Sequence, residues 1–194
     1  MKKRLILIIL ALAVVIGASA YINPARPDWT EEQHKLHTIA NMARGMGLPE
    51  DSPIIQEASR LWWEHQESYE RDLQILACVV LNEAPYCTDR HQQLVAQVVL
   101  NRAASPLFPD TVEAVVNQPG QYNPAYTKSV PAPDSPDPEV QRAFANAKLA
   151  MAGGVKCPEN VLYQSEFKSL GSGVYEEITV DTGWYRSTTY FNYG

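Results

Sequence analysis

The periodicity of the apolar residues changes once along this chain, and that change constrains the fold. From about residue 72 to residue 154, apolar side chains recur at the three- and four-residue spacing of helices. After residue 154, short segments rich in β-branched and aromatic residues alternate with glycine-containing turns. These segments predict three strands, at residues 161–167, 174–180 and 184–191. The pattern therefore predicts an α+β fold, in which a helical body is followed by a small antiparallel sheet.

Proline and polar residues set the expected helix boundaries in the helical body. One helix is predicted over residues 73–84, where Pro85 ends it because proline cannot donate to the helical ladder. The next is predicted over residues 89–104, with Asp89 at its start. Asp110 is expected to cap a short helix and Asp137 a longer one, since an aspartate side chain accepts bonds from free N–H groups.

The N-terminus has the pattern of an export segment. A basic start at residues 2–4 precedes an apolar run at residues 5–18, and residues 18–20 (Ala-Ser-Ala) fit the small-residue cleavage pattern. Extended to residue 22, the run approaches the length of one membrane span. Residues 1–22 are therefore expected to be a cleaved signal peptide or a membrane anchor. Either places the rest of the chain outside the cytoplasm, because the basic start stays inside.

Residues 23–69 are expected to form a proline-rich linker and a helical spacer. Prolines 24 and 27 favour an extended start. Two amphipathic helices follow, the first ending near Gly45 and the second beginning at Ser52. Trp62 and Trp63 lie in the second helix and fit either a packed helix face or a platform that stacks on sugars.

Charge and composition exclude some partners. The chain has 16 Lys+Arg against 22 Asp+Glu, a formal net charge of −6. Because no cluster of Lys and Arg follows the first four residues, nucleic acid is not an expected partner. The 3 Cys and 4 His are too scattered for a structural zinc module, and no metal or cofactor is expected.

Glu83 is the residue whose position most suggests chemistry. It lies seven residues after Leu76, nearly two helical turns, and therefore on the same apolar face. It also lies in the last turn before Pro85, at the negative end of the helix dipole. Both surroundings disfavour a charged carboxylate and raise its pKa, as a general acid requires. The alternative is a buried ion pair with a cation such as Arg102.

The cysteines suggest a disulfide. Cys87 and Cys157 lie in loops beside helices of a chain expected outside the cytoplasm, so they are predicted to pair. Cys78 lies inside the helix at residues 73–84 and is expected to be buried and free. Alternatively, Cys87 could be a nucleophile with His91 as its base.

The C-terminal half contains more tyrosines than a small core requires. Their hydroxyls and rings fit a groove that binds sugars, but strands also favour aromatic residues, and the sequence leaves both explanations open. The residues concerned are Tyr122, Tyr126, Tyr163, Tyr175, Tyr185, Tyr190 and Tyr193.

An ordered set of motifs resembles the SleB-type cell wall hydrolase family, the spore cortex-lytic enzymes. The motifs are LNEA at 81–84, LVAQVVLNR at 94–102, FPDTV at 108–112, QPGQY at 118–122, PENVLYQ at 158–164 and GSG at 171–173. The chain departs from the family after the Glu-Ala pair, where the family often has Arg-Gly and this sequence has Pro85-Tyr86-Cys87.

The resemblance implies a lysozyme-like catalytic domain, similar to lytic transglycosylases, at residues 70–194. It implies cleavage of the bond between N-acetylmuramic acid and N-acetylglucosamine in peptidoglycan, by a protein that faces the cell wall. It places the catalytic glutamate on Glu83 and the groove motifs on Asn101, Gln121, Tyr122, Tyr163 and Gln164.

The expected mechanism is lytic transglycosylation with Glu83 as the single acid/base and no metal or cofactor. The expected partners are peptidoglycan strands and, through residues 1–22 if uncleaved, the membrane. One alternative is a hydrolysing muramidase, which needs a second carboxylate about 5–10 Å from Glu83. Another is a non-catalytic anchored module that binds glycan. Candidates for the second carboxylate are Asp89, Asp110, Glu113 and Glu166.

Overall fold

The computed structural model describes residues 31–181, 183–184 and 186–194. The predicted signal peptide or anchor, residues 1–22, lies outside the described residues. The chain forms two compact units, which divide between Tyr69 and Glu70 inside one long helix. In the part of the chain that the structure describes, no helix is both long and apolar enough to cross a membrane.

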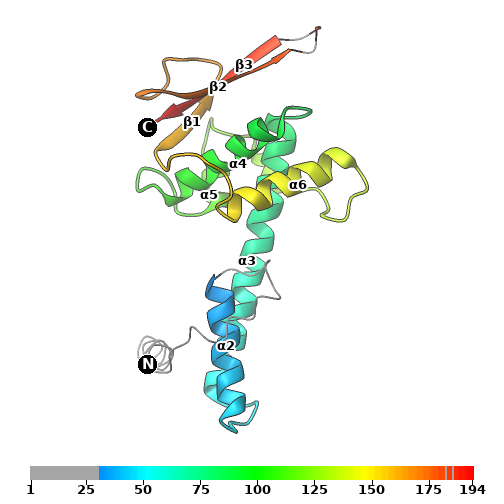
Figure 1. Ribbon diagram of the computed structural model, residues 1–194, viewed down its shortest axis with the longest axis vertical. Helices are drawn as coiled ribbons and strands as arrows, with labels where there is room; N and C mark the ends of the chain where they lie inside the picture. The colour runs from blue at the N-terminus through cyan, green and yellow to red at the C-terminus, as the bar shows by residue number, and fades with distance from the viewer. Residues whose placement is uncertain (1–30, 182, 185) are drawn as a thin grey trace. The chain divides into compact units, whose positions relative to one another are not determined.

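The first unit contains helix α2 (Glu31–Gly45) and the start of helix α3 (Pro53–Glu83), both labelled in Figure 1. Helix α2 ends at Gly45 as predicted, and Gly47 follows with φ of +79°, a conformation that glycine adopts easily after a helix. The buried face of α2 has helical spacing and consists of Gln33, Leu36, Ala40 and Ala43.

The two tryptophans of the first unit lie on α3. Their rings pack edge to face with centroids 4.8 Å apart. Trp62 is half-buried, whereas Trp63 is 60% exposed. Both line a cavity of about 280 Å³ together with residues such as Leu36 and Arg44. The pair is therefore partly a packed helix face and partly a surface.

Helix α3 corrects one prediction. The helix expected to begin at Ser52 and the helix expected over residues 73–84 are one continuous helix, Pro53–Glu83. The residues between the two apolar stripes include neither proline nor glycine, so nothing in the backbone interrupts the helix. The stretch between the two apolar segments, residues 63–74, contains no buried residue, and such a polar interval has the same signature in the sequence as a break. The end of the helix, at Glu83 before Pro85, is as predicted.

The core of the second unit is helical, and α4 (Asp89–Ala104) is its central helix. Side chains around most of α4 are buried, including Leu94, Val95 and Val98. They pack in one cluster with the last turns of α3, with α5 (Val112–Val116) and with α6 (Pro138–Met151). Figure 1 shows α6 crossing beside α4. This core holds the end of α3 and the loops around Glu83 in place.

The helix caps agree with the sequence in one case and differ in two. Asp137 caps α6, since its side-chain oxygen accepts from the N–H of Glu139 at 2.9 Å. Helix α4 is capped by Thr88 and α5 by Thr111, each one residue away from the predicted aspartates Asp89 and Asp110. A threonine hydroxyl makes the same bond as an aspartate carboxylate. In both helices the threonine is the residue with extended backbone just before the first helical residue, which is the capping position.

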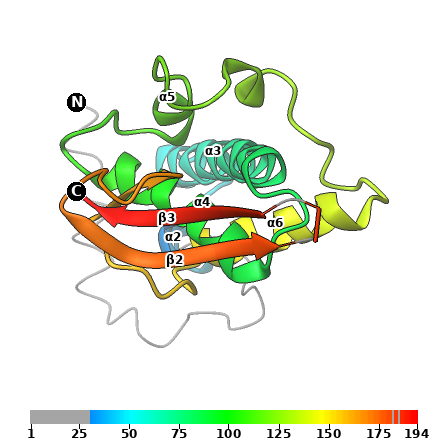
Figure 2. The ribbon, with the colours of Figure 1, turned by 90° about the horizontal axis from the view of Figure 1, so that it is seen from above.

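The sheet of the second unit has three antiparallel strands in the order β1-β3-β2. Phe191 of β3 is fully buried, and its ring meets the ring of His91 on α4 edge to face. Figure 2 shows β2 and β3 lying over the helices. The α+β prediction is therefore confirmed, with strand bounds that differ slightly from the expected ones: β1 (Val161–Ser165), β2 (Gly173–Asp181) and β3 (Arg186–Tyr193).

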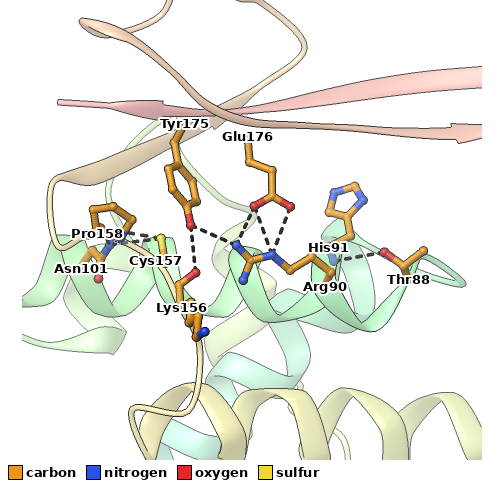
Figure 3. A network of polar contacts seen from close by, with 9 residues as sticks. All are labelled: Thr88, Arg90, His91, Asn101, Lys156, Cys157, Pro158, Tyr175 and Glu176. Carbon is orange, nitrogen blue, oxygen red and sulfur yellow. Dashed lines mark hydrogen bonds and ion pairs between the residues drawn. The ribbon is translucent and has the colours of Figure 1, made fainter.

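A polar network joins β2 to α4 (Figure 3). Arg90 of α4 pairs with Glu176 of β2 at 2.6 Å and donates to the hydroxyl of Tyr175 at 3.2 Å. That hydroxyl donates in turn to the carbonyl of Lys156 at 3.0 Å. The network fixes the sheet to the helical core through charged and polar bonds in addition to apolar contacts.

The structure contradicts the predicted disulfide, because Cys87 and Cys157 are both free thiols. Cys87 directly precedes the N-terminal cap of α4, whereas Cys157 lies against Asn101, near the other end of that helix. The two ends are separated by about 20 Å of helix, and a disulfide requires Cα atoms within about 7 Å. The prediction failed because the sequence shows that both cysteines lie in loops beside helices but does not show which helix ends are close in space. Cys78 is buried and free, as predicted.

Candidate active site

Glu83 lies at the C-terminal end of α3, where a buried helix face reaches the surface. Leu76 and Val80 on this face are fully buried, and Glu83 itself is exposed because the helix ends there. Partial removal of water by the surrounding protein raises the pKa of the Glu83 carboxyl, in the direction predicted from the sequence. The carboxyl is thus both reachable from solvent and easier to protonate than an ordinary glutamate.

Tyr126 is the hydrogen-bond partner of Glu83. Its hydroxyl donates to Oε1 of Glu83 at 3.1 Å. This bond favours the charged carboxylate and opposes the effect of desolvation on the pKa of Glu83. Burial, together with the nearby Glu83 charge, raises the pKa of Tyr126 to about 12. Tyr126 therefore remains a donor throughout the neutral range.

A short helix, η2 (Pro124–Thr127), holds Tyr126 in position. Asn123 caps it by accepting from the N–H of Ala125 at 2.9 Å. Thr127 donates through its hydroxyl to Oδ1 of Asn117 at 3.0 Å, and its carbonyl accepts from Arg71 of α3 at 2.6 Å. The turn that carries Tyr126 is thus tied to the same helix that carries Glu83.

Tyr122 links Glu83 to a second group of predicted residues. Its side chain is buried, and burial raises the pKa of its hydroxyl to about 12. The charge of Glu83 acts in the same direction and that of Arg102 in the opposite one, so Tyr122 lies within electrostatic reach of both. Its hydroxyl has no hydrogen-bond partner among the described residues.

Arg102 does not pair with Glu83, so the buried ion pair considered from the sequence is wrong. Its guanidinium is almost fully buried and donates to the carbonyl of Leu162 at 2.6 Å and to Oε1 of Gln121 at 2.9 Å. Aromatic rings surround it within 5.2–5.7 Å, those of Phe108, Tyr122 and Tyr163. Three of the predicted groove residues, Gln121, Tyr122 and Tyr163, are therefore brought together by one arginine.

The other two predicted groove residues have different surroundings. Asn101 is buried, and its amide donates to the carbonyls of Pro158 at 2.8 Å and Val161 at 2.9 Å. These bonds tie the start of β1 to α4, which is a structural role. Gln164 is half-buried on β1, and its Oε1 atom has no partner among the described residues.

Three of the four candidate second carboxylates are engaged elsewhere, and the fourth, Asp110, is exposed. Asp89 pairs with Arg142 at 3.2 Å, and Glu113 pairs with Arg71 at 3.1 Å. Glu166 accepts from the hydroxyl of Ser187 at 3.5 Å. Within the described residues, no carboxylate contributes to the pKa of Glu83. No group of three or more His, Cys, Asp or Glu side chains suited to a metal ion is found there either.

The alternative of a thiol nucleophile has little support from the chemistry of its two residues. Burial raises the pKa of the Cys87 thiol, with Arg142 acting in the opposite direction. A nucleophilic cysteine needs a lowered pKa. His91 is buried against Phe191, and burial lowers the pKa of its imidazole. These surroundings suit a packed histidine.

Sequence reasoning missed the specific importance of Tyr126 and Phe108. Tyr126 was only one of seven tyrosines, although Asn123 and Pro124 before it are a recognisable start for a short helical turn. Phe108 was noted as part of a motif, and nothing in the sequence indicates that its ring covers Arg102. The bond between Tyr126 and Glu83 joins residues 43 positions apart, and the contact between Phe108 and Arg102 depends on how the loop after α4 folds back.

Comparison with known proteins gives one positive finding. No curated protein and no solved structure matches the chain. A family model described as Cell Wall Hydrolase matches residues 88–189, which is more than half of the chain. The match covers α4, the Arg102 cluster, η2 and most of the sheet, and it begins five residues after Glu83. The chain therefore belongs to the Cell Wall Hydrolase family.

Proposed function

We propose that this cell wall hydrolase is a lytic transglycosylase that cleaves peptidoglycan between N-acetylmuramic acid and N-acetylglucosamine. Membership of the family supports peptidoglycan as the substrate. The observation that carries the finer assignment is Glu83, an exposed carboxyl with a raised pKa and a hydrogen bond from Tyr126. No metal or cofactor enters the proposed reaction.

Glu83 serves in both halves of the proposed reaction. Its protonated form gives a proton to the glycosidic oxygen while the bond from C1 of muramic acid to that oxygen breaks. The resulting carboxylate then accepts the proton of the C6 hydroxyl of the same muramic acid, and the C6 oxygen bonds to C1. The product is a 1,6-anhydro end, and Glu83 is again protonated. The Tyr126 hydroxyl stabilises the carboxylate between the two steps.

A hydrolysing muramidase is the second candidate. It would require a base or nucleophile opposite Glu83, at about 5–10 Å. The engagement of Asp89 and Glu113 in ion pairs favours the mechanism with one carboxyl group. A third possibility is a module that binds glycan without cleaving it. Binding alone does not require a glutamate with a raised pKa, so the pKa of Glu83 favours an enzyme.

Identification of the reaction products tests the proposal. Purified protein is incubated with intact peptidoglycan sacculi, and the soluble fragments are analysed by mass spectrometry. Fragments with 1,6-anhydro-muramic acid ends are expected. Reducing muramic acid ends would identify a hydrolase, and the absence of released fragments would identify a binding module.

The cellular location is proposed on the basis of residues 1–22 and the family. We infer that the protein acts outside the cytoplasm, either secreted or anchored to the cytoplasmic membrane. N-terminal sequencing of the exported protein is expected to begin at Tyr21 if the signal is cleaved and at Met1 if it is an anchor. Protein found only in the cytoplasm would contradict both forms.

A further inference from the structure

The turn that follows Glu83 has an unusual residue at its third position. Residues 84–87 form a β-turn, closed by a bond from the N–H of Cys87 to the carbonyl of Ala84 at 3.3 Å. Pro85 occupies the second position, and Tyr86 occupies the third with φ of +56°. A turn with proline second and a positive φ third favours glycine or asparagine there. Among the described residues, Tyr86 is the only non-glycine residue with positive φ.

The structure holds this turn at both ends. The carbonyl of Ala84 also accepts from the side chain of Gln92 on α4 at 3.1 Å, and both residues are fully buried. At the other end, the carbonyl of Cys87 accepts from Arg142 of α6, which pairs with Asp89. The bonds to α4 and α6 explain how a tyrosine is kept in a conformation that costs free energy for a side chain with a Cβ atom.

The ring of Tyr86 contributes little to packing, since the residue is 81% exposed. Its backbone lies three residues from Glu83, which limits their separation along the chain to about 10 Å. A braced turn therefore exposes an aromatic side chain whose backbone lies within about 10 Å of the backbone of Glu83. A strained and exposed tyrosine at this position does not stabilise the fold, so the stability of the fold gives no reason for its presence.

We propose that Tyr86 is a stacking residue that holds one sugar ring of the glycan strand beside Glu83. This inference rests on the proposed function and names a residue that it did not use. Sugar rings present faces of C–H groups, and these pack on the face of an aromatic ring, while a tyrosine hydroxyl remains in water. A sugar bound there would be one of those next to the bond that Glu83 protonates.

Two substitutions separate the ring from the backbone. Tyr86→Asn removes the ring and keeps a residue that tolerates positive φ, whereas Tyr86→Phe keeps the ring and loses only the hydroxyl. Cleavage of soluble uncrosslinked glycan strands is measured against substrate concentration. For Tyr86→Asn, KM is expected to rise by roughly three- to tenfold, the range of a single aromatic contact, with kcat changed less than KM. Tyr86→Phe should resemble the wild type, and neither variant should lower the thermal midpoint.

A binding experiment makes the test independent of turnover. In the Glu83→Gln background, Tyr86→Asn is expected to weaken binding to the same glycan strands by a similar factor. Equal binding with asparagine and tyrosine would overturn the proposal, as would an equal loss with phenylalanine and asparagine. If the proposed function fails, wild-type protein releases either no fragments or fragments with reducing muramic acid ends. If only the stacking role fails, wild type and Tyr86→Asn cleave alike.

Discussion

The two units of this chain differ in where they place charged side chains. The charged pairs of the first unit lie on the surface of helices, as between Lys35 and Glu31 at 2.8 Å, or between Arg60 and Glu57 at 2.7 Å. The second unit also has partly exposed pairs, such as Arg90 with Glu176 at 2.6 Å, but it buries Arg102 among aromatic rings and a carbonyl, with no carboxylate partner among the described residues. Exposed pairs contribute little to stability because water competes for them. Buried polar groups are costly unless satisfied, so they fix one arrangement of their neighbours.

Because of this difference, the polar bonds that fix one arrangement of the chain lie in the unit that contains the candidate active site. The polar bonds of Arg102 and Asn101 determine how β1 and the loop of Gln121 meet α4. In the first unit, helical spacing explains the apolar part of the buried face of α2, which is Leu36, Ala40 and Ala43, and the one buried polar residue of that face, Gln33, donates to Gln66 at 2.6 Å. Substitutions of like residues in the two units should therefore have very different effects.

The largest effect is expected when the two glutamates of α3 are compared. Glu83→Gln keeps the size of the side chain but cannot transfer a proton, so the rate of peptidoglycan release should fall by about 10²–10⁴-fold. Glu67→Gln changes an exposed glutamate of the same helix in the first unit and should leave the rate unchanged. Rates are followed by release of soluble fragments. A Glu83→Gln variant with near wild-type activity would remove Glu83 from the mechanism.

The next largest effect concerns the buried arginine. Arg102→Met removes two charged hydrogen bonds and leaves the carbonyl of Leu162 without its donor, so the free energy of unfolding should fall by about 2–3 kcal/mol. Arg102→Lys should not restore it, because an ammonium group does not reproduce a planar guanidinium between rings. Urea denaturation measures both. A loss below about 0.5 kcal/mol would show that the cluster does not organise the unit.

A smaller effect is expected on the pH profile. The hydrogen bond from Tyr126 lowers the pKa of Glu83, so Tyr126→Phe should raise that pKa further. Since the first step needs protonated Glu83, the alkaline limb of the pH–rate profile should move to higher pH. Tyr69→Phe, in the first unit, provides the matched control and should leave the limb in place. If the alkaline limb does not move in Tyr126→Phe, the hydrogen bond from Tyr126 does not affect the pKa of Glu83.

Stability should depend on the protonation of Glu83 with a definite sign. The pKa of this carboxyl is raised in the folded state, so the folded protein binds the proton more tightly than the unfolded chain. The resulting stabilisation is present below the unfolded pKa and is lost as pH rises through the folded pKa. The difference in free energy of unfolding between wild type and Glu83→Gln, measured across this range, should therefore shift against the wild type as pH rises. A constant difference would contradict the raised pKa.

The smallest effect is expected in the first unit. Arg60 bonds to Glu57 and Glu64 on the exposed face of α3, and Arg60→Ala should produce no measurable change in the urea midpoint. A loss comparable to that of Arg102→Met would remove the distinction between the two units.

Local signals in the sequence account for most of the fold. Pro85, Gly45 and Asp137 mark helix ends because each acts on its own backbone or on the next turn. The period of apolar residues predicted the three strands. The continuity of α3 was missed because the polar interval at residues 63–74, which contains no buried residue, has the same signature in the sequence as a break.

The candidate site was only partly predictable, for a physical reason. The helical phase of Glu83 relative to Leu76 is local and indicated the direction of its pKa shift. The partners of Arg102, Asn101 and Cys157 come from distant segments, and residue type and spacing do not specify which segments meet. The strained conformation of Tyr86 likewise depends on α4 and α6.

The order of strands in the sheet has a consequence for how the protein matures. The last strand along the chain, β3, lies between β1 and β2, which do not pair with each other. Chains are synthesised from the N-terminus, so β1 and β2 must wait as unpaired segments until Tyr193 has emerged. Unpaired strands invite association with other chains. The sheet therefore cannot form before the residues of β3 are available, because among the described residues neither β1 nor β2 has another strand as a partner.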